Sequence, residues 1–233
     1  MVARVRSAAP TTFALGLLLL AQVGPGCGTK GDGQIDGDVT VESQNRGEWR
    51  LFSFAAGDVL RDSDGVPLVV EDPADSEGWD LAISQWVLAT NSGTSASADS
   101  VGRGAILAVE GDPDEWPLLG DFSASCSDFD AADGTENVGA FGCNAPPPTV
   151  DDGWVADLLD DPDGAGPVVE VNYNPSLTFW FEYSFSGHEV FPYGHVYVVE
   201  GHDGACYKLQ VTDYYDADGE SGFVSFSWDA LPE

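Results

Sequence analysis

The alternation of apolar and polar residues in the C-terminal third of the chain predicts β-strands. From 177 to 185, apolar side chains alternate with mostly polar ones, and residues 205–212 repeat the alternation. A period of two places successive side chains on opposite faces of a strand. Two further apolar segments, 195–200 and 223–228, follow turn-forming Gly and Asp residues. Residues 171–228 are therefore predicted to form an antiparallel meander.

The rest of the pattern extends this prediction and marks one exception. From Trp49 onward, nearly every apolar segment is short, aromatic or β-branched, and bounded by Gly, Pro or Asp-Gly clusters. Residues 111–167 are instead dense in Asp, Gly and Pro, with little alternation. The chain is predicted to be all-β: an antiparallel sheet domain of meander or sandwich type with a long, irregular, acidic middle segment.

The N-terminal residues are typical of an export signal. Arg4 and Arg6 precede an apolar run from 13 to 23, which is too short to span a bilayer. Because small residues stand just before Cys27, we expect cleavage after residue 26 and lipidation of Cys27; the alternative is ordinary secretory cleavage that leaves Cys27 unmodified. Residues 27–46 are expected to be a Gly-rich acidic tether, and 47–233 a single domain. Contact with a membrane is then expected only through the lipid anchor.

The charge of the chain excludes one class of partner. Without residues 1–26, the chain keeps 6 basic and 40 acidic residues, a formal charge of −34. Such a field repels phosphate backbones, so we expect no nucleic-acid binding. Three Asp-rich turns, 62–65, 128–134 and 213–220, are candidates for calcium, although none has the spacing of a helix-loop-helix site. The alternative is that they are simply solvated turns.

The cysteines predict one disulfide. Cys126 and Cys143 lie on the same irregular segment, and an exported protein meets an oxidising compartment, so we expect them to pair. Cys206 lies within a predicted strand and is expected to be reduced and buried. The sequence contains no Gly-x-Ser-x-Gly, His-Glu-x-x-His or Cys-x-x-Cys pattern. A non-enzymatic function is therefore expected.

Three segments together resemble one known family. The first runs from Trp79-Asp80 through Trp86 to the turn at 90–95; the others are 49–54 and 207–226. They resemble the corresponding segments of HmuY-like lipoproteins, haem-binding surface proteins of Gram-negative bacteria. The resemblance implies an outer-membrane or cell-surface location, capture of haem and contact with an outer-membrane receptor. A structural or protein-interaction module that keeps the fold without a haem site is the alternative function.

The resemblance also implies which residues would hold haem. In the family, two histidines ligate the iron, with methionines in some relatives. Met1 is the only methionine here, and residues 96–187 contain no histidine, so the two-histidine pattern cannot be carried over directly. We expect His188 and His195 to share the ligation, or one of them to act with Tyr193. His202, one strand further along, is expected at the opposite end of the sheet.

Overall fold

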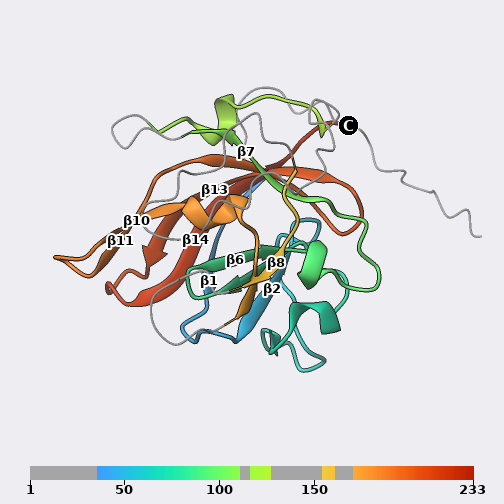
Figure 1. Ribbon diagram of the computed structural model, residues 1–233, viewed down its shortest axis with the longest axis horizontal. Helices are drawn as coiled ribbons and strands as arrows, with labels where there is room; N and C mark the ends of the chain where they lie inside the picture. The colour runs from blue at the N-terminus through green and yellow to red at the C-terminus, as the bar shows by residue number, and fades with distance from the viewer. Residues whose placement is uncertain (1–35, 111–115, 127–153, 161–169) are drawn as a thin grey trace, which may run out of the picture. The chain divides into compact units, whose positions relative to one another are not determined.

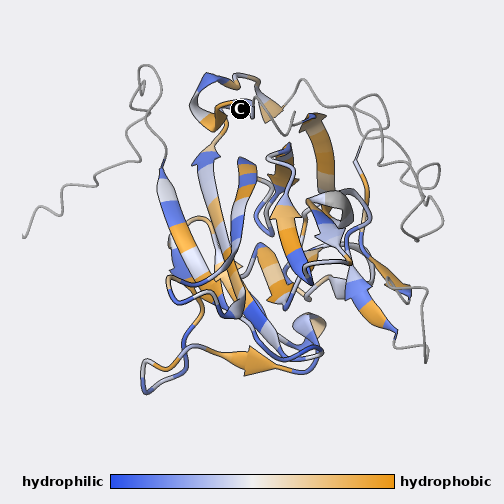
Figure 2. Ribbon diagram, turned by 90° about the vertical axis from the view of Figure 1, so that its left-hand side faces the viewer, coloured by the Kyte–Doolittle hydropathy of each residue, from blue (hydrophilic) through white to orange (hydrophobic). Residues whose placement is uncertain are grey.

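The computed structural model describes residues 36–110, 116–126, 154–160 and 170–233 (Figure 1). In these residues the regular structure is antiparallel β-strand, with helix only as short 3-10 turns. The all-β prediction is confirmed. Figure 2 shows hydrophobic and hydrophilic residues alternating along many of the strands. The 3-10 turns are η1 (Pro73–Asp75), η2 (Gly93–Ser95), η3 (Leu119–Asp121) and η6 (Ser176–Phe179).

The larger sheet has five strands, and the C-terminal meander supplies three of them. Its order is β1-β14-β13-β12-β7. The predicted strands at 195–200, 205–212 and 223–228 correspond to β12, β13 and β14, although β13 and β14 each extend over 10 residues. The bounds are β1 Gly37–Glu42, β7 Gly104–Val109, β12 Val196–Glu200, β13 Cys206–Tyr215 and β14 Ser221–Ala230.

A smaller sheet packs against the larger one and closes the core. Its order is β3-β2-β5-β6, with β4 also paired to β2. Aromatic rings join the sheets: Phe52 lies edge-on to Phe226, with ring centroids 5.1 Å apart, and Phe54 stacks on Tyr207 at 4.5 Å. Such pairs add to the free energy of burial. The strands are β2 Trp49–Ser53, β3 Asp58–Val59, β4 Val69–Val70, β5 Leu81–Ser84 and β6 Val87–Thr90.

Two short hairpin-like pairs complete the fold. β8 (Leu158–Asp160) pairs with β9 (Val171–Tyr173). Val171 and Tyr173 belong to an apolar cluster that also contains Trp49 and Trp79. The other pair is β10 (Phe181–Ser184) with β11 (Glu189–Pro192), which projects from the body of the domain in Figure 1.

The prediction that 27–46 is a tether is wrong for residues 37–42. These residues form β1, which pairs with β14 along its whole length, from Gly37 opposite Trp228 to Glu42 opposite Phe223. Val39 and Val41 face the core, while Asp38, Thr40 and Glu42 point outward. The alternation was missed because only two apolar residues carry it. An edge strand needs only one apolar row, so a short polar sequence suffices.

The strand predicted over 177–185 is also partly wrong. Its first part is η6, because Asn174 caps a turn there: its side-chain oxygen accepts a hydrogen bond from Ser176 N, and its carbonyl accepts one from Thr178 Oγ1. Strand geometry begins only at Phe181. The turn is favoured over the strand because Asn side chains compete locally for backbone hydrogen bonds.

The disulfide prediction is wrong as well, because Cys126 is bonded to Cys206, with Cα atoms 5.5 Å apart. The reason is the path of residues 116–126 across the outer face of β13. Lys208 Nζ donates to Phe122 O, and Cys126 N donates to Pro232 O, which brings Cys126 over the first residue of β13. Closeness in sequence was thus a poor guide to closeness in space. Cys143 lies outside the described residues.

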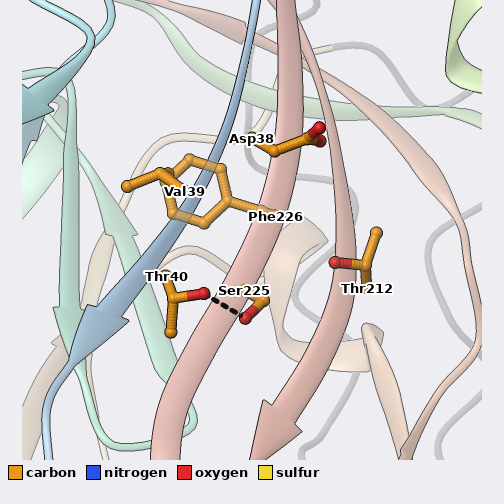
Figure 3. A pocket seen from close by; sticks show the side chains of 6 residues that line it. All are labelled: Asp38, Val39, Thr40, Thr212, Ser225 and Phe226. Carbon is orange, nitrogen blue, oxygen red and sulfur yellow. Dashed lines mark hydrogen bonds between the residues drawn. The ribbon is translucent and has the colours of Figure 1, made fainter. Parts of the chain in front are cut away.

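The edge of the larger sheet carries a small, open pocket of about 190 Å³ (Figure 3). Within it, Thr40 Oγ1 and Ser225 Oγ are hydrogen-bonded at 2.7 Å. The volume lies below the range of roughly 300–1,000 Å³ typical of small-molecule pockets. Its lining residues are Asp38, Val39, Thr40, Thr212, Ser225 and Phe226.

Candidate functional site

The β10–β11 hairpin presents His188 at its tip. The strands pair from Phe181 opposite Pro192 to Ser184 opposite Glu189, so residues 185–188 form the turn. His188 N donates to Ser184 O at 2.8 Å, and His188 has φ 56°, in the left-handed region. Histidine is among the non-glycine residues found there more often than most. The conformation turns the chain sharply and leaves His188 exposed.

Two aromatic rings of the hairpin lie near this histidine. The Tyr183 hydroxyl is hydrogen-bonded to His188 Nδ1 at 2.9 Å. The rings of Tyr183 and Phe185 meet edge to face, with centroids 5.2 Å apart, and Phe185 is 71 % exposed. The exposed aromatic rings offer an apolar surface, and the imidazole beside them offers one nitrogen that can ligate a metal.

Tyr193 and His195 lie past the base of the hairpin, in a different environment. Their rings are stacked, with centroids 5.2 Å apart, and His195 is only 7 % exposed. Burial lowers the pKa of His195, although the charge of Glu110 opposes that shift. Burial, aided by the charge of Glu182, raises the pKa of Tyr193. The imidazole is therefore held neutral near pH 7.

The structure does not bring His188 and His195 together. His188 immediately precedes β11, whereas His195 follows the end of that strand by three residues. The four residue steps from His188 to Pro192 along β11 span roughly 13 Å. One histidine is exposed and the other is enclosed between the rings of Tyr193 and Tyr197.

His202 lies at the far end of β12, as predicted, and it is held by a buried carboxylate. Its Nδ1 and its backbone N both contact Asp80 Oδ1, at 2.7 and 2.9 Å, and Asp80 Oδ2 accepts from Phe54 N at 2.8 Å. Asp80 is 1 % exposed. Partial burial by itself would lower the pKa of His202, but the hydrogen bond that its imidazole makes to Asp80 and the charges of Asp80, Asp203 and Asp99 raise it overall.

A second buried carboxylate organises the neighbouring loops. Asp157 accepts hydrogen bonds from Thr90 N at 2.9 Å, Ser95 Oγ at 2.6 Å and Asn174 Nδ2 at 2.9 Å. Its full burial raises its pKa to about 6, although the hydrogen bonds from Ser95, Thr90 and Asn174 work against the shift. Neither Asp157 nor Asn174 stands out in the sequence, because the partners that join the two to this network lie 17 to 84 residues away.

These contacts give Trp79-Asp80 and the turn at 90–95 a structural role. Asn91 Nδ2 donates to Trp79 O at 2.8 Å, and its Oδ1 accepts from Ser97 N. Asp80, Thr90, Asn91 and Ser95 are all buried. They join strands and loops rather than face solvent.

Two groups of side chains in the described part of the chain have the spacing of metal ligands. One contains Cys126, Cys206 and Glu200, and its sulfur atoms are joined in the disulfide, so they are not thiolate ligands. The other contains Asp80, His202 and Asp203.

The Asp-rich turns give no support to calcium. Asp62 Oδ1 accepts from the backbone N of Asp64 and of Val66, and Asp216 Oδ1 accepts from Asp218 N and Glu220 N. These carboxylates close their own turns, as Asx turns do. The third turn, 128–134, lies outside the described residues.

Sequence comparison identifies one matching family. A profile described as HmuY protein matches residues 45–228 of this chain. No curated protein matches the sequence significantly. Within the described residues, no helix has both the length and the apolar character needed to cross a bilayer.

Several solved structures show limited similarity. A Bacteroides vulgatus protein, described as HmuY-like and heme-binding, is 19 % identical, with 82 % of this chain and 90 % of that chain covered and a TM-score of 0.47. The apo HmuY analog of Tannerella forsythia is 18 % identical over 84 % and 96 %, with a TM-score of 0.48. Apo PinO from Porphyromonas gingivitis is 16 % identical over 85 % and 97 %, with a TM-score of 0.49.

Proposed function

Because this chain belongs to the HmuY family over residues 45–228, as the three segments predicted, we propose that it is an exported, non-enzymatic protein that captures haem. The observation that carries the proposal is the exposed imidazole of His188 among aromatic rings at the tip of the β10–β11 hairpin. Porphyrins are large and apolar, so exposed aromatic rings give them favourable contact surface.

The residues of the hairpin fit haem through one histidine rather than two. The hydrogen bond between the Tyr183 hydroxyl and His188 Nδ1 orients the ring; with Nδ1–H as its donor, Nε2 is the nitrogen left for iron. Bound haem would supply an iron centre whose spin state depends on its axial ligands. His195 and Tyr193, the other expected ligands, stack on each other beyond the base of the hairpin, so His188 is our single proposed protein ligand.

The charge of the hairpin gives the proposal a second observable. Glu182 and Glu189 are both exposed on it, and the haem propionates carry the same sign of charge. Like charges repel, and salt screens the repulsion. We therefore expect haem binding to strengthen as ionic strength rises.

A titration of the full chain with haem, followed by the Soret absorption, tests the proposal. We expect His188→Ala to weaken binding and to change the spectrum, because the iron loses its protein nitrogen. Leu118→Ala is the control for adsorption, since Leu118 is also an exposed apolar residue, at 68 %, but lies away from the hairpin sequence. Tyr193→Phe tests the alternative oxygen ligand and should leave the spectrum unchanged.

Identical titrations of the wild type and His188→Ala would mean non-specific adsorption. The chain would then be better described as a structural or protein-interaction module that keeps the fold without a haem site. The separation of His188 from His195 favours that alternative, because the family's two-histidine arrangement is not reproduced by these residues.

We further propose that Cys27 carries lipid and anchors the protein at the outer membrane or cell surface, where an outer-membrane receptor would be its partner. A diacylated cysteine supplies membrane affinity that a polar, acidic surface does not. Cys27→Ser should move the protein from the membrane fraction to the soluble fraction. Unchanged fractionation would rule out the anchor without affecting the haem proposal.

A further inference from the structure

We propose that Asp80, His202 and Asp203 form a binding site for a divalent transition-metal ion such as Zn²⁺. His202 Nδ1 and one carboxylate oxygen from each aspartate all lie within 4.8 Å of one another. A single ion with bonds of about 2.0–2.2 Å to nitrogen and oxygen can join atoms at nearly this spread. The site is at the β12–β13 turn, at the other end of β13 from the His188 hairpin.

The excess of negative charge around His202 favours the binding of a cation. Three carboxylates, those of Asp80, Asp99 and Asp203, act electrostatically on this one imidazole. The lysine and arginine ion pairs found in the described residues involve other acids, namely Asp58, Glu200 and Asp229. Negative charge therefore exceeds positive charge at the turn, and a divalent ion would correct the imbalance.

The backbone already holds the two aspartates in place. Asp80 is 1 % exposed, and Phe54 N fixes its second oxygen. Asp203 Oδ1 accepts from Ala205 N at 3.0 Å. A Cβ atom at Gly201 would lie 2.6 Å from Asp80 Oδ1 and 3.4 Å from Asp203 Oδ1, so both oxygens converge over Gly201, which has no side chain to obstruct them. Little reorganisation is needed, which favours binding.

The exchange of a proton for the ion is chemically simple. In the structure His202 Nδ1 and Asp80 Oδ1 are hydrogen-bonded at 2.7 Å. The ion would take the place of the proton between them, while His202 N continues to donate to Asp80 Oδ1. The side chain of His202 is 21 % exposed, so the position can be reached from solvent. Imidazole favours Zn²⁺, Ni²⁺ or Cu²⁺ over Mg²⁺ or Ca²⁺, which prefer oxygen alone.

Calorimetric titration of the chelator-stripped full chain with Zn²⁺ tests the proposal. Physiological salt and excess Mg²⁺ suppress diffuse binding to the acidic surface. We expect one saturable site per chain, and a loss of at least about tenfold in affinity in both His202→Gln and Asp203→Asn. Asp64→Asn is the matched control, since Asp64 is also an exposed turn aspartate, and it should bind Zn²⁺ as the wild type does.

Two results would overturn the proposal: the absence of a saturable site, or an affinity that His202→Gln and Asp203→Asn leave unchanged. Asp203→Asn can keep the hydrogen bond from Ala205 N through its amide oxygen, so it guards against a folding defect in His202→Gln. The absorption bands of Co²⁺, used in place of Zn²⁺, should change in His202→Gln, because they depend on the ligands and geometry of the bound ion. Haem is absent from every arm, so the outcome is independent of the proposed haem function.

Discussion

The two ends of β13 hold their histidines in opposite ways. At one end, the Tyr215 hydroxyl accepts a hydrogen bond from Val190 N of the β10–β11 hairpin, and His188 stands exposed beyond it. At the other end, His202 is fixed to the buried Asp80, and Asp157 binds the adjacent loops. The first end is an aromatic surface with few constraints, and the second is a network of buried polar groups.

This difference explains why the sequence identifies the family more readily than it identifies the residues that bind a ligand. The recognised residues, Trp79-Asp80 and the turn at 90–95, belong to the buried network, where a change would leave polar groups without partners. They therefore report the fold. The hairpin tip is exposed, and few buried contacts restrict its sequence. Its chemistry has to be tested rather than inherited from the family.

The largest expected effect comes from breaking the buried network at Asp157. Asp157→Ala leaves Thr90 N and Ser95 Oγ without their acceptor and removes one acceptor of Asn174 Nδ2, which keeps its bond to Val155 O. Each buried donor without a partner costs about 1–3 kcal/mol, so unfolding free energy should fall by roughly 4 kcal/mol or more. Urea denaturation followed by tryptophan fluorescence measures the change. A loss under about 1 kcal/mol would mean that the network is not a stabilising element.

Removing the disulfide should have the next largest effect. Cys206→Ala opens a loop of 80 residues at the same end of β13, which we expect to lower the unfolding free energy by about 2–4 kcal/mol. Mass spectrometry of a non-reduced digest of the wild type should join the peptides that contain Cys126 and Cys206. A fragment that joins Cys126 to Cys143 instead would contradict the pairing.

The network should also respond to pH. Because the pKa of Asp157 is raised from 3.8 to about 6 in the folded state, the folded protein binds this proton more tightly than the unfolded chain does. Its contribution to stability is complete below about pH 4 and is lost as pH rises through 6, by on the order of 2–3 kcal/mol. The stability advantage of the wild type over Asp157→Asn should therefore shrink between pH 4 and 7. An advantage independent of pH would refute the raised pKa.

The smallest effect is expected at the hairpin. His188→Ala removes an exposed side chain with one hydrogen bond, so the unfolding free energy should change by no more than about 0.5 kcal/mol. The same variant is expected to lose haem binding, which would separate function from stability at this end of β13. A thermal unfolding midpoint several degrees below that of the wild type would instead assign His188 a structural role.

Much of the fold was predictable because strands carry their pattern locally. Alternation identified β12, β13 and β14 within a few residues, since each has a continuous apolar row against the core. The errors arose where a distant partner decides the outcome. Residues 37–42 form the strand β1 because they pair with β14. Cys126 contacts Cys206 only because residues 116–126 cross the face of β13.

The candidate sites divide along the same line. The exposed hairpin histidine could be recognised from its aromatic neighbours in sequence, because the hairpin is local. The Asp80–His202 contact joins residues 122 positions apart, and the bonds to Asp157 span up to 67. Contacts between single residues so far apart produce no repeating pattern of residue types, so the sequence alone does not predict them.

The pairing of β1 with β14 has a consequence for the proposed lipid anchor. If Cys27 is the anchored residue, the nine residues from 28 to 36 are all that separate the acyl chains from the first strand. Fully extended, they reach about 30 Å, roughly the thickness of a bilayer's hydrocarbon core. A receptor in the same membrane would therefore contact this domain close to the lipid headgroups, because the start of β1 fixes the greatest distance between the anchor and the folded domain.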